Sequence, residues 1–273
     1  MRRRPASGRD DEMLTRPPLV RGIERDSVVV LYSGGSDSTW AAIKAYDKRR
    51  RVQLLTMTRL GLLHQEHVAD QVGKLKRFFG DHDAFAHRSV PCDKLFRFIL
   101  YENYLPNLLR YGSLLLSHCG LCKLAIHWRA LLFCLENGFT NVWDGAVRIA
   151  RAYPERSQAI MIEALTRLYA RYGIAYETPV YEQGEAVPRA LHEIGFHRRA
   201  DVEGTGDDRR IICSQRILFS MFLRWYLPKG SFEDYELDMA AFYRAKFSLI
   251  EAMTDAYLAG AEGADRLARL VES

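Results

Sequence analysis

The stretch Val28-Val29-Val30-Leu31-Tyr32-Ser33-Gly34-Gly35-Ser36-Asp37-Ser38 is the part of this chain that decides its fold. Four consecutive apolar residues, 28–31, predict a short buried strand. Two adjacent glycines follow, and residues 39–46 have the composition of a helix. Glycine lets the backbone approach a ligand closely and adopt a positive φ. Backbone N–H groups at such a turn and at a helix N-terminus attract anions, so this order predicts a phosphate-binding turn.

The side chains of this turn add polar groups to the predicted site. Ser33, Ser36 and Ser38 offer hydroxyl donors. Asp37 stands at the start of the predicted helix, where a carboxylate either caps the helix or holds a magnesium ion that bridges phosphates. The turn has neither the G-x-x-x-x-G-K-[ST] pattern of a Walker loop nor the G-x-G-x-x-G pattern of a dinucleotide-binding loop.

Strand and helix signals alternate through the first two thirds of the chain. The predicted strands are 27–32, 52–57, 84–90, 140–143 and 174–180, and the predicted helices are 37–50, 64–79, 92–110, 121–137 and 156–172. Such alternation predicts an α/β fold with a Rossmann-like parallel sheet of about five strands and helices on both faces. Ligands bind at the carboxyl ends of strands in these sheets, and the Gly-Gly turn follows one such end.

Three segments are expected along the chain. Residues 1–24 are polar and proline-containing and predict a flexible basic tail. Residues 25–185 form the α/β domain that carries the phosphate-binding turn. Residues 186–273 form a mainly helical C-terminal extension that packs on the same domain, with a polar loop over 201–210 and helices over 213–227, 238–258 and 262–271.

Composition favours an ordinary globular protein over a membrane protein or a secreted disulfide scaffold. The 273 residues are 48% hydrophobic and 27% charged, and their apolar runs are far shorter than a membrane span. The basic N-terminus has no apolar segment behind it, so no secretory signal is expected. Five cysteines, an odd count, argue against a disulfide framework and favour the cytoplasm. The net charge of +5 suits a nucleotide or RNA substrate, although a solvated basic surface gives the same value.

The spacing of the cysteines indicates a second functional site. Cys119 and Cys122 make a C-x-x-C pair at a predicted helix start, where the N–H groups favour thiolate. Such a pair is typical of a redox couple, half of a zinc site or part of an iron–sulfur site, and His118 or His127 would supply a further zinc ligand. Cys213 follows two isoleucines and is either a further ligand or a small buried hydrophobe. The remaining cysteines, Cys92 and Cys134, are expected to pack or cap.

The six residues from Ser33 to Ser38 resemble the pyrophosphate loop of the PP-loop ATP pyrophosphatase superfamily, the adenine nucleotide α-hydrolase-like proteins with a HUP-type fold. That resemblance implies that ATP is cut between its α and β phosphates, usually with transfer of AMP to a substrate oxygen. The order of loop, C-x-x-C and distant cysteine resembles the tRNA 2-thiolation enzymes of this superfamily. It implies that Cys119, Cys122 and Cys213 hold a [4Fe-4S] cluster whose fourth iron carries sulfur, with zinc as the lesser option.

The chain also departs from those enzymes. Trp143-Asp144-Gly145-Ala146 stands where they carry a segment similar to Gly-His-Asn-x-Asp-Asp, and the terminal zinc-finger cysteines of the 2-thiouridine group are absent. A divergent subfamily is therefore expected, and its acceptor is either a tRNA base or a small metabolite.

Further candidate residues lie at the predicted edge of the sheet. Lys123 is expected to neutralise phosphate or sulfur charge, or is a solvated lysine. Asp144 ends a strand and is expected to hold magnesium or orient the acceptor, or is a turn residue before glycine. Met57 and Arg59, at the end of the second predicted strand, are expected beside the adenosine. Arg148 belongs to an arginine-rich loop that clamps phosphate or acceptor, or is simply exposed.

Together these features predict an ATP-dependent sulfurtransferase that uses Mg²⁺ and a sulfur donor, with Asp37, Lys123 and Asp144 as catalytic residues. One alternative is an amidating or nitrogen-transferring ligase of the same superfamily with structural cysteines or zinc. Another is a nucleotide-binding protein without turnover. A homodimer is a further possibility that the sequence leaves undecided, since dimers are common for such folds.

Overall fold

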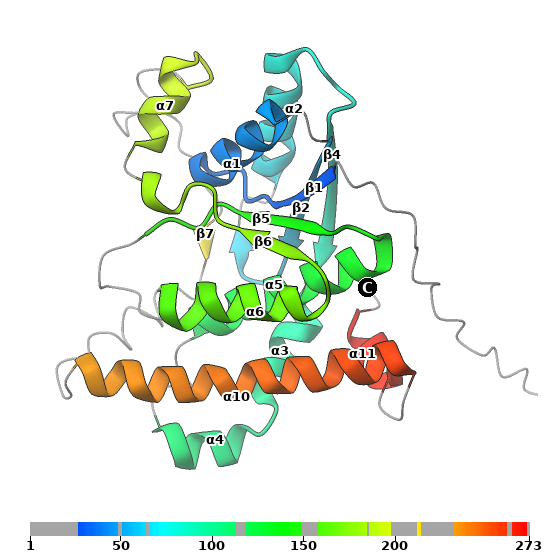
Figure 1. Cartoon of the computed structure of the whole chain (residues 1–273), viewed down its shortest axis with the longest axis vertical. Helices are drawn as coiled ribbons and strands as arrows, with labels where there is room; N and C mark the ends of the chain where they lie inside the picture. Colours follow the sequence, from blue (N-terminus) through cyan, green and yellow to red (C-terminus); the bar gives the residue numbers. More distant parts are fainter. Residues whose placement is uncertain are drawn as a thin grey trace, which may run out of the picture.

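The structure is a computed structural model that describes residues 27–48, 51–63, 66–112, 118–148, 158–184, 186–197, 212–213, 232–260 and 264–271. In this part of the chain a five-stranded sheet forms the centre, and its strand order is β4-β2-β1-β5-β6 (Figure 1). Its strands are β1 (Ser27–Leu31), β2 (Arg51–Thr58), β4 (Phe85–Pro91), β5 (Asn141–Asp144) and β6 (Ala175–Glu177). Every neighbouring pair is parallel, which confirms the predicted α/β class.

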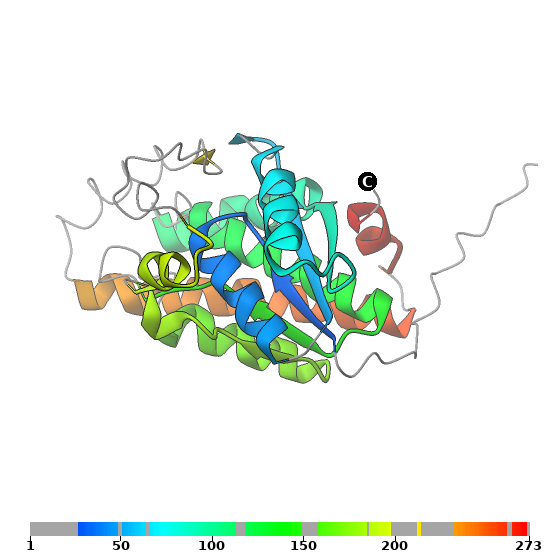
Figure 2. The ribbon, with the colours of Figure 1, turned by 90° about the horizontal axis from the view of Figure 1, so that it is seen from above.

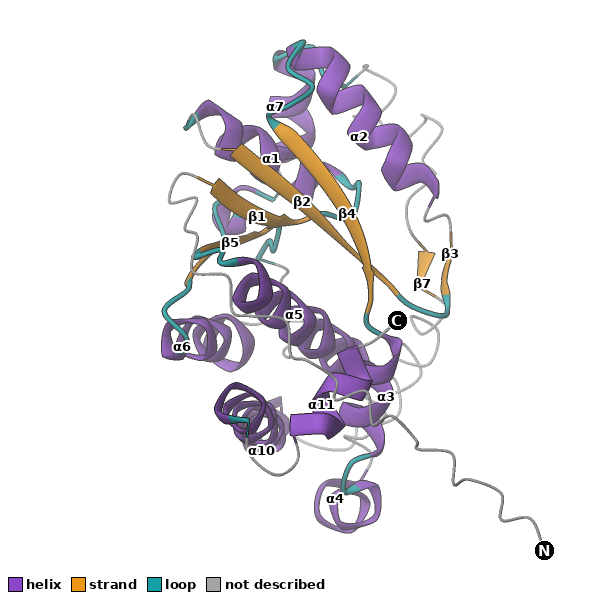
Figure 3. Cartoon of the chain, turned by 90° about the vertical axis from the view of Figure 1, so that its right-hand side faces the viewer, coloured by secondary structure: helices purple, strands orange, loops and turns teal. Residues whose placement is uncertain are grey.

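Helices cover both faces of the sheet. Figure 3 shows one group on one face, namely α1 (Ser36–Asp47), α2 (Glu66–Phe79) and α7 (Val187–Glu193). The other face carries α3 (Asp93–Tyr101), α5 (His118–Asn137) and α6 (Glu163–Arg171). Beyond these lie α4 (Tyr104–Tyr111), α10 (Phe232–Ala259) and α11 (Ala264–Val271). Figure 2 shows α10, in orange, running past the green helices α5 and α6. The two faces therefore differ, with one helical layer on the first and two on the second.

Strand β1 is apolar over residues 28–31 because it is buried on both faces. Val28 and Val30 belong to the core cluster shared with α1 and α2, while Val29 and Leu31 belong to the cluster shared with α5. Side chains of a strand alternate between faces, so each face of β1 needs its own apolar pair.

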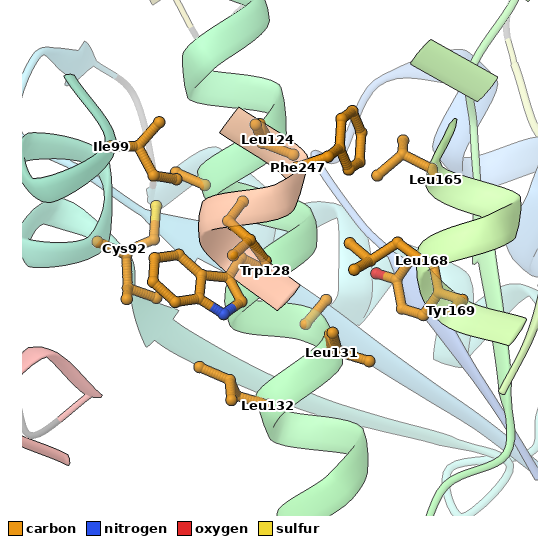
Figure 4. Close-up of a cluster of buried hydrophobic side chains, with 14 of the residues drawn as sticks. Cys92, Ile99, Leu124, Trp128, Leu131, Leu132, Leu165, Leu168, Tyr169 and Phe247 are labelled. Atoms are coloured by element: carbon orange, nitrogen blue, oxygen red, sulfur yellow. The ribbon is translucent and has the colours of Figure 1, made fainter. Parts of the chain in front are cut away.

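The C-terminal helices are part of the larger core. Figure 4 shows Trp128 of α5 among apolar side chains from α6 and α10, including Leu168 and Phe247. The Trp128 indole Nε1 donates to Thr254 Oγ1 of α10 at 3.0 Å. Lys246 of α10 is buried, and its Nζ donates to the carbonyl oxygens of Ile99 at 2.5 Å and Glu102 at 3.1 Å. A buried lysine therefore satisfies carbonyls at the end of α3 that have no helical partner.

The predicted helix over 92–110 is wrong, because it is two helices. Glu102 is extended, with ψ 124°, and Asn103 has φ 56°, a left-handed conformation that asparagine tolerates better than most residues. Lys246 binds the end of α3, and Arg266 of α11 donates to the Glu102 carboxylate at 2.8 Å. Contacts with the distant helices α10 and α11 stabilise the kink between α3 and α4. The local sequence does not reveal these contacts.

Several other predicted helices agree with the structure only in part. Helix 156–172 is observed as a π-helix, η3 (Gln158–Ile162), followed by α6, and α7 was not predicted. A short 3₁₀ helix, η4 (Tyr181–Gln183), precedes α7. Residues 212–213 form β7 (Ile212–Cys213), antiparallel to β3 (Leu62–Leu63). The predicted tail 1–24, the loop 201–210 and residues 214–227 lie outside the described residues. The domain boundary at residue 185 stays a prediction.

Among the described helices, none has the length and apolar character needed to cross a bilayer.

Truncation of Phe242 tests whether α10 belongs to the core. Phe242 is fully buried, so Phe242→Ala is expected to lower the free energy of unfolding by about 3–5 kcal/mol. Leu237 lies on the same helix but is 71% exposed, and Leu237→Ala should change it by less than about 0.5 kcal/mol. Urea unfolding followed by circular dichroism measures both. Equal effects of the two substitutions would contradict the packing described above.

Candidate active site

The turn 33–35, for which the sequence predicts phosphate binding, lies at the point where the order of strands reverses. From β1 the chain moves outward through β2 to β4, and it then returns to β5 on the other side of β1. The carboxyl ends of β1 and β5 therefore border a crevice of the kind in which open α/β sheets bind ligands. The turn 33–35 follows β1, and residues 145–148 follow β5.

The turn is held by its own side chains. Gly34 has φ 75°, a conformation that glycine adopts without strain. The Ser33 backbone N–H donates to Ser38 Oγ at 3.2 Å, and that hydroxyl donates to the Gly35 carbonyl at 3.1 Å. Thr39 makes the first backbone bond of α1, to the Gly35 carbonyl at 3.0 Å. The first N–H groups of any α-helix have no acceptor within the helix, so a helix N-terminus such as that of α1 favours an anion.

Gly145 packs directly against the start of α1. A Cβ atom at Gly145 would lie 2.7 Å from both Cα and N of Ser38 and 2.9 Å from the carbonyl carbon of Asp37. Real side chains do not approach backbone this closely, so the position requires glycine for close approach. The segment after β5 is thereby held against the first turn of α1.

A cavity of about 390 Å³ lies between these segments, which is a suitable size for a small ligand. Strand β1 and the turn contribute Leu31, Tyr32, Ser33, Gly35, Asp37 and Ser38. Strand β2 contributes Leu55, Thr56 and Met57. Helix α5 contributes Cys119, Cys122, Lys123, Ile126 and His127. Strand β5 contributes its last residue, Asp144, and the segment after it contributes Gly145, Ala146 and Val147. Gly34 and Ser36 belong to the turn but are not among these lining residues.

Asp144 is the centre of a charged group in this cavity. Its Oδ2 lies 3.1 Å from Lys123 Nζ and 3.3 Å from His127 Nε2, and it accepts a hydrogen bond from the Tyr176 hydroxyl at 3.2 Å. Burial alone would raise the pKa of Asp144, but Lys123 and the hydrogen bond from His127 outweigh it and hold that pKa well below its usual range. Asp144 is therefore an ionised carboxylate at neutral pH.

His127 is uncharged in this setting. Burial lowers its pKa below the usual value, and Asp144 offsets only part of that effect. Its Nδ1 lies 3.3 Å from the Tyr169 hydroxyl, which also donates to the His127 carbonyl at 3.1 Å. Lys123 and His127 are four residues apart on α5, so they share one helix face and reach the same carboxylate.

The cysteines divide into two pairs. Cys119 and Cys122 are part-buried in the first turns of α5 and line the cavity, as the predicted helix start implied. Cys92 and Cys134 are buried in the larger core, which confirms their packing role. Burial, with a further contribution from Cys122, raises the pKa of Cys92 to about 12, so this thiol stays protonated.

Two of the three predicted cluster ligands, Cys119 and Cys122, line the same cavity. Strand β7 pairs Cys213 with Leu62, but the side chain of Cys213 lies outside the described residues. Among the described side chains, no group of three His, Cys, Asp or Glu residues is arranged to hold a metal ion. Cys119 and Cys122 therefore supply two of the three thiols that the predicted cluster requires, and the third stays a prediction.

The remaining predicted residues lie in different surroundings. Met57 lines the cavity. Arg59 is buried with its guanidinium 4.6 Å above the centre of the Phe96 ring, and it is not a lining residue. Arg148 is exposed and pairs with Glu182 at 2.9 Å, also away from the lining. The ATP contacts predicted for Arg59 and Arg148 stay predictions.

Sequence reasoning missed the partners of Asp144. The sequence suggests His127 only as a zinc ligand, although its spacing of four residues from Lys123 indicates a shared helix face. Tyr176 comes from the neighbouring strand and Tyr169 from α6, and the sequence carries no signal that joins them to Asp144.

Comparisons with known proteins give matches to solved structures at low sequence identity only. No protein-family model matches the chain, and no curated protein matches it. A solved structure described as a predicted subunit of tRNA methyltransferase from Methanocaldococcus jannaschii is 20% identical, with a TM-score of 0.38, over 62% of this chain and 74% of that one. A 4-thiouridine synthetase, solved in complex with RNA and ATP, is 13% identical, with a TM-score of 0.49, over 82% of this chain and 54% of that one.

Substitution of Gly145 tests the contact between the two segments of the site. In Gly145→Ala the new Cβ must displace the first turn of α1, and overpacking of this kind costs about 1–3 kcal/mol. We expect this cost to weaken Mg·ATP binding, because the displaced turn must return for the ligand to bind. The affinity should then drop by about 5- to 150-fold. Isothermal titration calorimetry measures the affinity.

Gly73→Ala is the matched control. Gly73 lies inside α2, and its nearest neighbour is the flexible end of Arg77, so alanine should leave ATP affinity unchanged and stabilise the helix by about 1 kcal/mol. Unchanged ATP affinity in Gly145→Ala would show that this contact does not shape the site.

Proposed function

We propose that this chain is a PP-loop enzyme that uses ATP to adenylate a carbonyl oxygen of its acceptor and then replaces that oxygen with sulfur. The observation that carries the proposal is a single cavity lined by the Ser33–Ser38 turn, the Lys123–Asp144 pair and the thiols of Cys119 and Cys122. Groups suited to phosphate, to charge neutralisation and to sulfur chemistry thus face one space at the switch point of the sheet.

The turn and its neighbours would bind the triphosphate. The N–H groups at the start of α1 bind phosphate oxygens, and the helix N-terminus adds partial positive charge. Asp37, in the first turn of α1, holds Mg²⁺ on the phosphates. Lys123 neutralises negative charge that develops on the α-phosphate or on pyrophosphate. Met57, a lining residue on β2, would offer its backbone groups to the adenine.

The reaction has two displacements. The acceptor oxygen attacks the α-phosphorus, the bond from that phosphorus to the β-phosphate bridging oxygen breaks, and pyrophosphate leaves with the electron pair. A sulfur nucleophile then attacks the carbon that bears the adenylated oxygen, and AMP leaves, which creates the thiocarbonyl. The loop and Mg²⁺ lower the barrier of the first step because they bind the charge that accumulates on phosphate.

The thiols of Cys119 and Cys122 stand at the start of α5, where the helix N-terminus favours thiolate. With Cys213 they would hold a [4Fe-4S] cluster. Such a group supplies an iron site that carries sulfur to the adenylated carbon. Zinc bound to the same residues is the lesser option and would leave sulfur delivery to an external donor.

A tRNA base is the preferred acceptor, because the residues of the loop and the order of the cysteines resemble the tRNA thiolation enzymes. A small metabolite with a carbonyl oxygen is the other option. A nitrogen-transferring ligase would use the same first step, and the two-thiol set among the described residues is compatible with cysteines that only stabilise the fold.

The products of ATP cleavage test the first step. Purified protein incubated with Mg²⁺, [α-³²P]ATP and total tRNA from a strain lacking this gene should release AMP and pyrophosphate in equal amounts. Asp37→Asn is expected to lower the rate by about 100-fold or more, since the carboxylate that would hold Mg²⁺ on the phosphates is lost. Asp47→Asn, at the exposed end of the same helix, serves as the control and should retain the rate. Formation of ADP and phosphate would contradict the proposal.

Metal analysis tests the second step. Anaerobically purified protein should be brown and contain about four iron and four sulfide per chain. Cys119→Ser, Cys122→Ser and Cys213→Ser should each lose the iron, whereas Cys134→Ser, which removes a buried core thiol, should retain it. Colourless protein that contains zinc would favour the nitrogen-transferring alternative or an external sulfur donor.

A further inference from the structure

Three buried aromatic residues lie behind Asp144, and we call them the aromatic bracket: His127, Tyr169 and Tyr176. The Tyr169 and Tyr176 rings stack, with centroids 5.2 Å apart and an angle of 15°. The His127 ring meets both edge-on, at 5.9 Å and 5.4 Å. Helix α5, helix α6 and strand β6 each supply one member, so the bracket joins three elements behind a single carboxylate.

The bracket and the cavity contact the same carboxylate oxygen. Oδ2 of Asp144 is the oxygen within reach of His127, Tyr176 and Lys123. His127 and Tyr176 reach it from the buried bracket. Lys123 is more exposed, with 16% of its side chain accessible against 1% for His127. Among these three donors, Lys123 is therefore the one with room to move.

Hydrogen bonding determines the tautomer of His127. Nε2 faces an ionised carboxylate and must carry a proton to donate to it. The Tyr169 hydroxyl lies 3.3 Å from Nδ1 and has one proton, which it gives either to the His127 carbonyl oxygen or to an unprotonated Nδ1. The neutral Nε2–H tautomer donates to the carboxylate and places no charge in the core.

We infer that His127 and Tyr176 are positioning residues that hold Asp144 so that Lys123 can move from this carboxylate to a phosphate oxygen of the bound nucleotide. This inference rests on the proposed function, because it requires a phosphate group in the cavity. A buried carboxylate that loses its cation is strongly destabilised unless other donors remain. His127 and Tyr176 remain bonded to Oδ2 when Lys123 leaves, so they lower the cost of that transfer.

The arrangement of α5 makes the transfer specific to Lys123. His127 is confined by the two tyrosine rings, and Tyr169 also binds its backbone carbonyl at 3.1 Å. Lys123, one turn earlier on the same face, has a long side chain that borders the cavity together with Ser33 and Asp37 of the turn and its helix. A fixed donor and a movable donor thus share one acceptor.

Paired ligands test the inference. The probes are Mg·α,β-methylene-ATP, which carries phosphates, and adenosine, which carries none. His127→Leu and Tyr176→Phe each remove one donor to Asp144, so Lys123 should stay on the carboxylate and the affinity for the phosphate-bearing probe should fall by about 10- to 100-fold. Adenosine affinity should be unchanged. His127→Gln retains an N–H donor and should remain within about 5-fold of wild type.

Tyr172→Phe is the matched control. The Tyr172 hydroxyl donates to Asp255 and to the Glu251 carbonyl, and this residue does not line the cavity. Its loss should leave both affinities unchanged. Nitrogen-15 NMR of histidine-labelled protein, with the His127 signal assigned from the His127→Gln variant, should show a neutral ring protonated at Nε2.

Distinct results overturn the inference and the proposed function. Wild-type protein that fails to bind Mg·α,β-methylene-ATP would overturn both. Normal binding in wild type together with unchanged affinity in His127→Leu and Tyr176→Phe would overturn the inference alone. Equal losses of adenosine and nucleotide affinity, or a glutamine variant as weak as the leucine variant, would show that His127 acts only through packing. A ring protonated at Nδ1 alone would also overturn the inference.

Discussion

The contact between Gly145 and the first turn of α1 is the constraint on which the rest of the site depends. It brings the end of β5 against the start of the helix that follows β1, with no room for a side chain between them. Asp144, the preceding residue, is thereby placed beside the phosphate-binding turn. A larger residue at position 145 would separate the turn from the carboxylate that binds Lys123.

Burial of apolar side chains on both faces of the sheet holds the strands beside this contact in place. The apolar pairs of β1 belong to two separate cores, and the second core extends through α5 to α10. Helix α5 carries Lys123 in its first half and His127 and Trp128 in its middle, where the indole of Trp128 is bonded to Thr254 of α10. The C-terminal helices thus help to position a helix whose first turns line the cavity, although they lie outside the central sheet.

Local sequence determines some of these features and distant contacts determine the others. The turn, the five parallel strands and the C-x-x-C helix start could be predicted because glycine pairs, apolar runs and helix signals are local. The break between α3 and α4 could not, because Lys246 and Arg266 hold it from far along the chain. Tyr176, a donor to Asp144, was missed for the same reason, since it lies on a neighbouring strand. The roles of Arg59, Arg148 and Cys213 remain predictions.

Hydrogen–deuterium exchange with and without Mg·α,β-methylene-ATP tests the central claim most directly, namely that one nucleotide occupies the cavity between the turn, α5 and the end of β5. The account predicts slower exchange in peptides that cover residues 33–39, 119–127 and 144–147, because backbone N–H groups there become bonded or shielded. Peptides from α2 and from the middle of α10 should be unchanged. Unaltered exchange over residues 33–39, with protection elsewhere in the chain, would contradict the account.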